Sequence, residues 1–336
     1  MNRQVFVIGL MVFLLCGIHS YVHASGGDHL YAVLINGGRN RLTNHERYWN
    51  DCAFLYRTLR NTYRVPKRNI TVLMSDGGTI GEDMLRDDGR GFLSSPIDLD
   101  GDGQLDIDHP ATQQVVTQVL VNLSRKLRTD DHLFIFVMDH GGKNEQEDEP
   151  FIWLWSDEKL DAYSLASLLG LFRVASVNIL MGQCYSGGFI PYLKEEGLII
   201  ATACSGNEQS WVCPDRPYDE FVYHWTCAMN GADELGNPVH ADSDGNGQVS
   251  MAEAFHYAKE HDRVYETPQY ASWPESLGEQ WTIASSLSGE LGVHEIKTSD
   301  EPPSAIWTLS GQRSGSVNGH SVYIQREGGK IRKIVR

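Results

Sequence analysis

Two stretches of the chain share one pattern, an unbroken apolar run followed by a reactive side chain and glycines. The first run, 132–138, leads to His140 and Gly141, and the second run, 177–181, leads to Cys184. Apolar runs of this length are typical of strands buried on both faces, as in a parallel sheet. Because the carboxyl ends of parallel strands meet at one edge, we expect His140 and Cys184 to lie on neighbouring loops.

The rest of the pattern predicts alternating strands and helices, so the fold class is α/β with a mostly parallel central sheet. Further apolar runs are expected to form strands at 30–35, 70–74 and 198–203, and the apolar residues 151–155 lie between the runs 132–138 and 177–181. Amphipathic spacing predicts helices at 44–63, 112–127, 161–172, 219–229 and 252–262. The segment 77–110 is expected to be a long loop, and loops of that length commonly have a function of their own.

Both ends of the chain differ from the middle. Residues 1–24 resemble an export signal, with Arg3, a short apolar stretch at 5–16 and a small-residue cleavage site before Ser25. A membrane anchor is the alternative, although the apolar stretch is short for one. We therefore expect an exported protein, whether secreted, periplasmic or at the cell surface, with no membrane span in the mature chain. The expected domain is 25–298, followed by a small β tail at 299–336.

The net charge argues against some classes of binding partner, and the number of cysteines suggests a free thiol. The formal net charge is −16 without a long basic cluster, which argues against nucleic acid and anionic membranes. Five cysteines remain after the signal, and an odd number suggests one free thiol, for which Cys184 is the candidate. The other four could form two disulfides or stay reduced: Cys52, Cys204, Cys213 and Cys227.

The pairing of His140 with Cys184 predicts nucleophilic chemistry. A neighbouring imidazole raises the thiolate fraction of a cysteine, and thiolate is the nucleophilic form. Gly141 leaves the backbone after the histidine uncrowded, so its amide could face a developing oxyanion. No organic cofactor is required for such a reaction.

Two acidic loops predict calcium sites. The loop 242–253 has the spacing of an EF-hand loop, with Gly247 at the turn and Glu253 as the bidentate ligand. Its other ligand positions are Asp242, Asp244, Asn246, Gln248 and Ser250. The loop 98–109 repeats part of the pattern with Asp98, Asp100, Asp102 and Asp106, but position 12 is His109, so Asp108 or another acid would have to replace the missing carboxylate.

These motifs resemble the legumain family of cysteine peptidases, which shares the caspase fold. The resemblance rests on Asp139-His140-Gly141 after one strand and Cys184-Tyr185-Ser186-Gly187 after the next, within about 30–229. It implies a three-layer sandwich and a peptidase that cuts after a chosen P1 residue. It also implies that His140 is the acid–base, that Cys184 is the nucleophile, and that the amides of Gly141 and Cys184 bind the oxyanion.

The same resemblance implies a substrate pocket. Arg47 aligns with a pocket arginine, Ser210 lies in the segment that resembles the substrate loop, and Asp215 or Asp219 would supply an acid. Gly182-Gln183 departs from the animal and plant enzymes, so asparagine preference does not follow. The end of the chain, 306–336, resembles the end of sorting domains on proteins exported by the Bacteroidetes type IX system, which would make a secretion or sorting apparatus a partner.

Three functions are compatible with these residues. The first is a secreted, calcium-stabilised cysteine endopeptidase that acts on a peptide or protein. The second is a transpeptidase of the same family, in which an amine rather than water resolves the thioacyl-enzyme. The third is a non-enzymatic, calcium-dependent binding protein with the caspase fold. Fast alkylation of Cys184 would separate the first two from the third.

Overall fold

The computed structural model describes residues 29–288 without 145 and 147, together with the backbone of four short strands between 304 and 335. The chain divides into two compact units, 1–292 and 293–336. The expected signal peptide lies outside the described residues. None of the helices that are described is long and apolar enough to cross a bilayer.

The first unit is organised around a six-stranded sheet with the order β11-β10-β9-β5-β1-β2. Five strands run parallel, and β11 pairs antiparallel with β10 at one edge. The bounds are β1 Leu30–Asn36, β2 Ile70–Met74, β5 His132–Val137, β9 Ser176–Met181, β10 Leu198–Thr202 and β11 Gln269–Trp273. The predicted α/β fold with a mostly parallel central sheet is confirmed.

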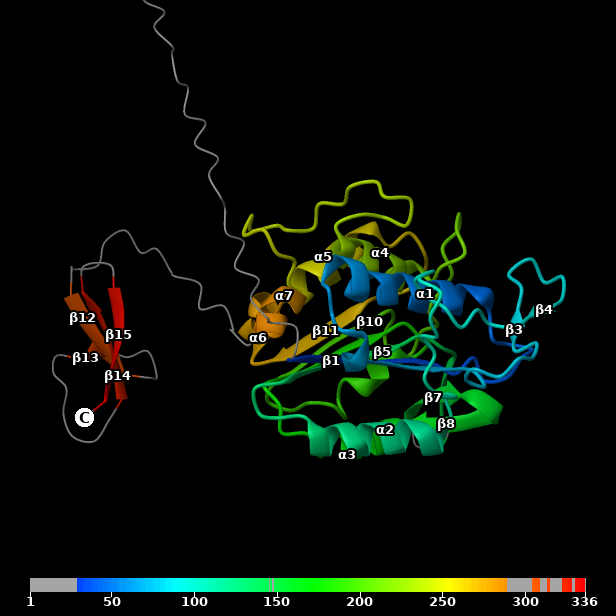
Figure 1. Ribbon diagram of the computed structural model, residues 1–336, viewed down its shortest axis with the longest axis horizontal. Helices are drawn as coiled ribbons and strands as arrows, with labels where there is room; N and C mark the ends of the chain where they lie inside the picture. The colour runs from blue at the N-terminus through cyan, green and yellow to red at the C-terminus, as the bar shows by residue number, and fades with distance from the viewer. Residues whose placement is uncertain are drawn as a thin grey trace, which may run out of the picture. The chain divides into compact units, whose positions relative to one another are not determined.

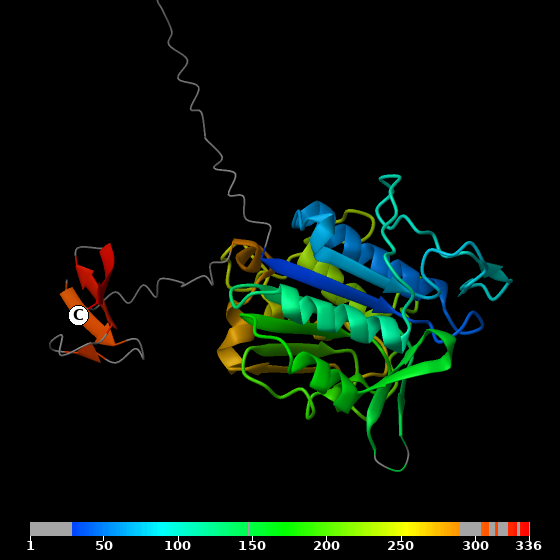
Figure 2. The same cartoon turned by 60° about the horizontal axis from the view of Figure 1, so that its bottom comes forward.

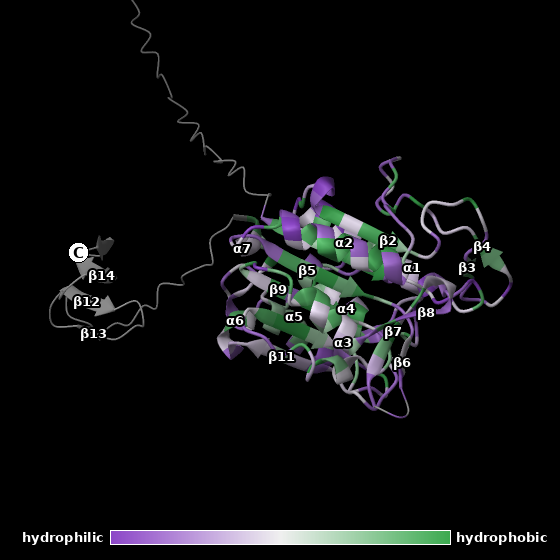
Figure 3. Ribbon diagram, turned by 90° about the horizontal axis from the view of Figure 1, so that it is seen from below, coloured by the Kyte–Doolittle hydropathy of each residue, from purple (hydrophilic) through white to green (hydrophobic). Residues whose placement is uncertain are grey.

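Helices cover both faces of this sheet because its central strands are apolar on both faces. In β5, Phe134 and Phe136 pack into one hydrophobic cluster, whereas Leu133 and Ile135 pack into the other. Figure 1 shows one helical layer above the sheet and one below it, and Figure 3 shows the apolar colours of the central strands. The upper layer holds α1 Glu46–Arg57, α4 Glu220–Asn230 and α5 Met251–His261, and the lower layer holds α2 Gln113–Lys126 and α3 Ala162–Leu169.

Several of these helices start close to the predicted residues, and a side chain caps the first turn of each. Thr112 caps α2 and Asp161 caps α3 by accepting hydrogen bonds from main-chain N–H groups in the first turn. Ser250 and Glu253 form a reciprocal capping box at the start of α5. The helix expected at 44–63 is α1 followed by a π-helical turn at Thr58–Thr62.

Several elements were not predicted. The residues 151–155 do not join the central sheet, because β7 Pro150–Leu154 pairs antiparallel with β6 Gly141–Lys143 and β8 Glu158–Asp161. The β6–β7 hairpin projects from the body (green in Figure 2). The long loop carries a short hairpin of β3 Met84–Leu85 and β4 Phe92–Leu93. After β11 come α6 Glu275–Gln280 and α7 Ile283–Ser288.

The second unit has an antiparallel sheet of four strands in the order β13-β12-β14-β15. Its strands are β12 Ser304–Thr308, β13 Arg313–Ser314, β14 Val322–Glu327 and β15 Lys330–Val335. The unit begins at Val293, whereas the sequence suggested a boundary at 299. A sorting role for this part of the chain stays a prediction.

Candidate active site

His140 lies on the loop that leaves β5, and the buried Asp139 before it fixes that loop. One Asp139 carboxylate oxygen accepts hydrogen bonds from the main-chain N–H groups of Gly37 (2.6 Å) and Gly38 (2.9 Å), at the end of β1. The other oxygen accepts the N–H of His140 at 2.6 Å. Burial raises the pKa of Asp139 well above its usual range, although the three N–H groups oppose that shift. Asp139 therefore joins the ends of two neighbouring strands just below the imidazole.

The imidazole of His140 is oriented by a main-chain carbonyl. Its Nε2 lies 2.9 Å from the carbonyl oxygen of Thr43. A carbonyl oxygen only accepts hydrogen bonds, so Nε2 must carry the hydrogen in the neutral ring and Nδ1 must hold the lone pair. Burial and then the positive charges of Arg47 and Arg39 lower the pKa of His140, while the Thr43 bond opposes the shift. The neutral, basic imidazole is favoured, as a proton acceptor requires.

Cys184 follows β9 on a tight turn. The next residue, Tyr185, has a positive φ of 60°, a left-handed conformation that is costly for a tyrosine, and it leads into a 3₁₀ turn at Ser186–Phe189. The Cys184 sulfur is partly exposed, and it lies 3.7 Å from the hydroxyl and 4.0 Å from the carbonyl oxygen of Ser210. The predicted substrate-loop residue Ser210 is thus placed at the thiol.

The loops that carry His140 and Cys184 touch at Gly141. A methyl group added to Gly141 would clash with the carbonyl oxygen of Cys184 and would lie 2.9 Å from its carbonyl carbon. Only a glycine permits this approach of the two main chains. The expectation that His140 and Cys184 lie on neighbouring loops agrees with this contact. Within the described residues, the hydrogen bonds of the sulfur go to Ser210, and those of the ring go to Thr43 and Tyr48.

Beside His140, a buried ion pair joins α1 to the start of α4. Arg47 Nε donates to a carboxylate oxygen of Asp219 at 3.1 Å, and the two side chains are 18% and 5% exposed. Behind them, the carboxylate of Asp51 accepts the main-chain N–H of Asp219 at 3.1 Å. Burial raises the pKa of Asp219 to about 6 and that of Asp51 well above its usual range. The two carboxyl groups share one buried site, and Asp219 is the one that lies against Arg47.

The structure separates the two acids between which the sequence could not choose. Asp219 contacts Arg47, whereas Asp215 is paired with Arg263 (2.9 Å) and Arg216 (3.1 Å) at the surface. These two arginines lower the pKa of Asp215. Asp219 is therefore the acid that lies against Arg47, and Asp215 belongs to a surface ion-pair network.

The segment after α5 holds the loop that carries Ser210. Glu266 accepts the main-chain N–H of Trp211 at 2.7 Å. Glu208 accepts hydrogen bonds from the N–H and the hydroxyl of Thr267, at 3.1 and 3.0 Å. Burial, followed by the charge of Asp262, raises the pKa of Glu266 to about 10. The loop that carries Ser210 is thus fixed by a neighbouring segment rather than by its own packing alone.

The acidic loop at 242–253 brings three carboxylates together. Ligand oxygens of Asp242, Asp244 and Glu253 lie within 4.8 Å of one another. Both oxygens of Asp242 accept main-chain N–H groups, including that of Gly247 at 2.8 Å, and these bonds lower its pKa. A cluster of hard, ionised oxygens of this kind fits calcium. No helix enters the loop, and the Ser250 hydroxyl at position 9 caps α5 instead.

The first acidic loop has similar main-chain geometry but fewer free oxygens. Asp98, Asp100 and Asp106 lie together, whereas Asp102 is outside the group. Asp106 is buried and accepts hydrogen bonds from the Tyr56 hydroxyl and the Leu99 N–H. Asp108 does not replace the missing carboxylate, because it accepts from Val72 N–H at 2.8 Å and from Lys67. Calcium in this loop remains a prediction with less support.

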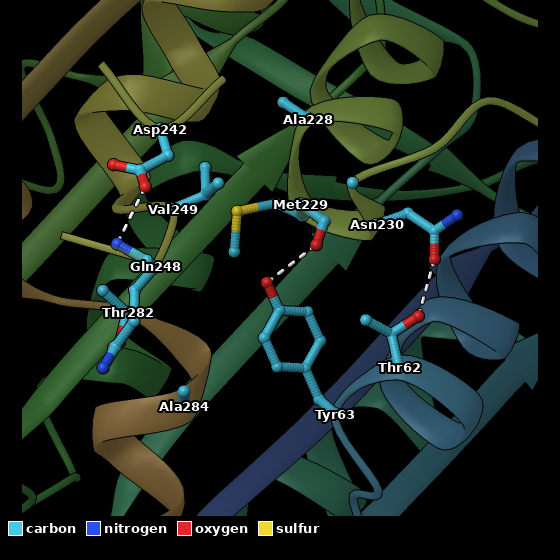
Figure 4. Close-up of a pocket in the computed structure, with 12 residues that line it drawn as sticks. Thr62, Tyr63, Ala228, Met229, Asn230, Asp242, Gln248, Val249, Thr282 and Ala284 are labelled. Carbon is cyan, nitrogen blue, oxygen red and sulfur yellow. Dashed lines mark hydrogen bonds between the residues drawn. The ribbon is translucent and has the colours of Figure 1, made fainter. Parts of the chain in front are cut away.

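A cavity of about 290 Å³ lies beside the 242–253 loop. Figure 4 shows that Tyr63, Met229 and Val249 line it, with the Tyr63 hydroxyl donating to the Met229 carbonyl oxygen at 2.7 Å. Asp242 and Gln248 form its side toward the acidic loop. His140, Cys184 and the Arg47–Asp219 pair do not line it.

Three further side chains at the site were not predicted from the sequence. The hydroxyl of Tyr48 contacts His140, Asp51 accepts the main-chain N–H of Asp219, and Glu266 accepts that of Trp211. The contacts of Asp139 could have been predicted from the sequence. Gly37 and Gly38 follow the end of a predicted strand, and their N–H groups donate to Asp139.

All five described cysteines are free. Cys52, Cys204, Cys213 and Cys227 are buried, whereas Cys184 is partly exposed. The sequence left two alternatives for these four cysteines, two disulfides or free thiols. In the structure they are free thiols.

Comparisons with known proteins agree with the motifs. Residues 112–276 match the model of the Peptidase C13 family. No curated protein matches the chain. Among solved structures, a crystal structure of a protein from Geobacter sulfurreducens is similar, with 13% identity and a TM-score of 0.42, covering 73% of this chain and 93% of that one.

Proposed function

We propose that this protein is an exported cysteine endopeptidase with a Cys184–His140 dyad. The basis is that residues 112–276 match the C13 peptidases, the legumain family that the sequence motifs resemble. The family match supports a cysteine peptidase of the legumain type, and such an enzyme acts on a peptide or protein. The observation that supports the dyad is the main-chain contact between Gly141, next to His140, and Cys184.

In the proposed reaction, Nδ1 of His140 accepts the thiol proton, because Nε2 already carries a hydrogen bonded to Thr43. The Cys184 sulfur then forms a bond to the carbonyl carbon of the scissile peptide, and the carbonyl oxygen becomes an oxyanion. The imidazolium returns its proton to the leaving amine as the C–N bond breaks. Water next attacks the thioester, again with His140 as the base, and releases the acid and the free thiol.

The main chain around the dyad supports the charge that develops on the substrate. The amides of Gly141 and Cys184 are the proposed oxyanion donors, and main-chain donors of this kind need no rearrangement during the reaction. Arg47, Asp219 and Ser210 form the proposed P1 pocket. The first two lie together beside His140, and the third lies at the thiol.

A profile of fluorogenic peptides varied at P1, measured on the mature protein from Ser25, tests this function. We expect cleavage after one class of P1 residue, because the ion pair of Arg47 and Asp219 offers one donor and one acceptor in fixed places. Inclusion of an amine nucleophile would show transpeptidation as a ligated product. Absence of cleavage for every P1 residue, together with slow alkylation of Cys184, would refute the peptidase and favour the binding protein.

Calcium at 242–253 is the second part of the proposal. Asp242, Asp244, Asn246, the main chain of Gln248 and Glu253 would hold the ion. The ion would neutralise their mutual repulsion and fix the start of α5, because Glu253 belongs to its first turn.

We predict that calcium raises the melting temperature of the wild-type protein and that Glu253→Gln removes most of this increase. An ion at 100 times its Kd stabilises a fold by about 2.7 kcal/mol. Glutamine keeps an acceptor for the capping box, so the folded state should survive the substitution. Melting curves with calcium and with a chelator measure the effect, and Glu195→Gln, at an exposed acid outside both acidic loops, is the control. Equal curves for the wild type in both conditions would contradict a calcium site.

A further inference from the structure

The hydroxyl of Tyr48 lies between the proposed P1 pocket and the catalytic imidazole. Its oxygen is 3.3 Å from Nδ1 and 3.4 Å from Nε2 of His140, and the two rings meet edge to face at 5.3 Å. On the other side, Arg47 Nη2 donates to the same oxygen at 3.3 Å. The Arg47 guanidinium also lies over the Tyr48 ring, 4.7 Å from its centroid. Tyr48 is only 3% exposed, so water does not replace these contacts easily.

The direction of these hydrogen bonds follows from the chemistry of the groups. Arginine has donors only, so Arg47 occupies a lone pair of the Tyr48 oxygen and leaves the hydroxyl hydrogen for His140. Nε2 of His140 is already a donor to Thr43, and the Tyr48 oxygen is almost equally far from both ring nitrogens, with the two rings edge to face. The hydroxyl hydrogen therefore faces the imidazole ring and leaves the lone pair of Nδ1 for the thiol proton. Burial raises the pKa of Tyr48 well above its usual range, so the hydroxyl keeps its proton.

We propose that Tyr48 is a positioning residue that holds the neutral imidazole of His140 and joins it to the Arg47–Asp219 pair. This inference rests on the proposed function, because it assigns a role to a residue in the proposed peptidase site. The connected path runs from Asp219 through Arg47 and Tyr48 to His140, each step being a side-chain hydrogen bond. The imidazole is thereby coupled to the pocket that would receive the P1 side chain.

A hydroxyl hydrogen that faces the ring stabilises the neutral imidazole relative to the imidazolium, because its partial positive charge opposes the charge of the imidazolium. Loss of the hydroxyl should therefore raise the pKa of His140. Several other titratable groups lie around His140 and stay unchanged when only this oxygen is removed. His45 is 5.6 Å away between ring centroids, and the charges of Arg39 and Arg47 act on the imidazole. Asp139 accepts the main-chain N–H of His140, and Cys184 lies on the loop that touches Gly141.

The test is Tyr48→Phe, which keeps the ring and removes the oxygen. We expect the pKa of His140, followed by NMR of the imidazole in a Cys184→Ala background, to rise by about 0.5–1 unit, the size of one hydrogen bond. In the otherwise wild-type enzyme, kcat should fall about five- to tenfold while KM changes little, because Tyr48 does not touch the substrate. Tyr63→Phe is the matched control, since it removes the hydroxyl of another tyrosine, which is half-buried and donates to the Met229 carbonyl oxygen rather than to His140.

The two measurements separate this inference from the proposed function. The NMR titration needs no activity, so an upward shift in Tyr48→Phe and none in Tyr63→Phe would support the link even for a protein that cleaves nothing. An unchanged pKa and unchanged kcat in a Tyr48→Phe enzyme that cleaves peptides would overturn the link and leave the peptidase in place. Equal changes in both variants would also overturn it, because a general loss of packing would then explain them.

Discussion

Replacing Cys184 by alanine is expected to abolish peptide cleavage while the protein stays folded. The sulfur is the proposed nucleophile, and removing the nucleophile from a covalent mechanism lowers kcat by roughly a millionfold. The fold should tolerate the change because the sulfur is partly exposed and its contacts are long, at 3.7 and 4.0 Å to Ser210. We expect a change in the free energy of unfolding of less than about 0.5 kcal/mol.

Cys52→Ala is the matched control for this prediction. Cys52 is fully buried on α1, so its loss should lower stability and leave the cleavage rate nearly unchanged. Both variants are compared by initial rates on the best fluorogenic peptide and by thermal melts. Residual cleavage by Cys184→Ala above a few per cent of the wild-type rate would contradict the proposed mechanism.

Adding one methyl group at Gly141 is expected to lower kcat/KM by about a hundredfold or more. The methyl would clash with the main-chain carbonyl of Cys184, and neither partner is a flexible side chain that can turn away. One catalytic loop must therefore move, and a displacement of about 1 Å at a reacting group costs about a hundredfold in rate. Overpacking of this kind also lowers the free energy of unfolding by about 1–3 kcal/mol.

Gly78→Ala provides the comparison for Gly141→Ala. Gly78 lies in the long loop, and a methyl group there would meet no atom within 4 Å. We expect wild-type activity from Gly78→Ala and loss of activity from Gly141→Ala, measured on the same substrate. Full activity of Gly141→Ala would show that the two loops are farther apart in solution, and it would remove the main geometric support for the dyad.

The sequence predicted the elements whose side chains are buried on both faces. The runs that became β5 and β9 are mostly apolar because each strand is buried on both faces. The polar exception within the run 177–181 of β9 is Asn178, which is buried and donates to the Ser176 hydroxyl. The edge strand β11 was not predicted, because its residues are all half-buried and mix polar with aromatic side chains. The β6–β7 hairpin was missed because Gly141 and Gly142 give no strand signal.

The position of the strands also decided which residues of the candidate site could be predicted. His140 and Cys184 could be predicted because each follows a strand of the parallel sheet, and parallel strands end at one edge. The partners of each group could not, because they come from distant parts of the chain. Tyr48 and His140 are 92 residues apart, and Arg47 and Asp219 are 172 apart. The sequence alone does not distinguish Asp215 from Asp219 as the partner of Arg47. The position at which α4 begins decides which of the two lies beside Arg47.

Because four free thiols are buried, their alkylation would report the unfolding of this protein. Cys52, Cys204, Cys213 and Cys227 are 0–4% exposed, while Cys184 is partly exposed. A small alkylating reagent should therefore add one mass increment to each folded chain, and five once the described core opens. The mass distribution of a labelled sample would then count folded and unfolded molecules directly, with no substrate and no optical probe.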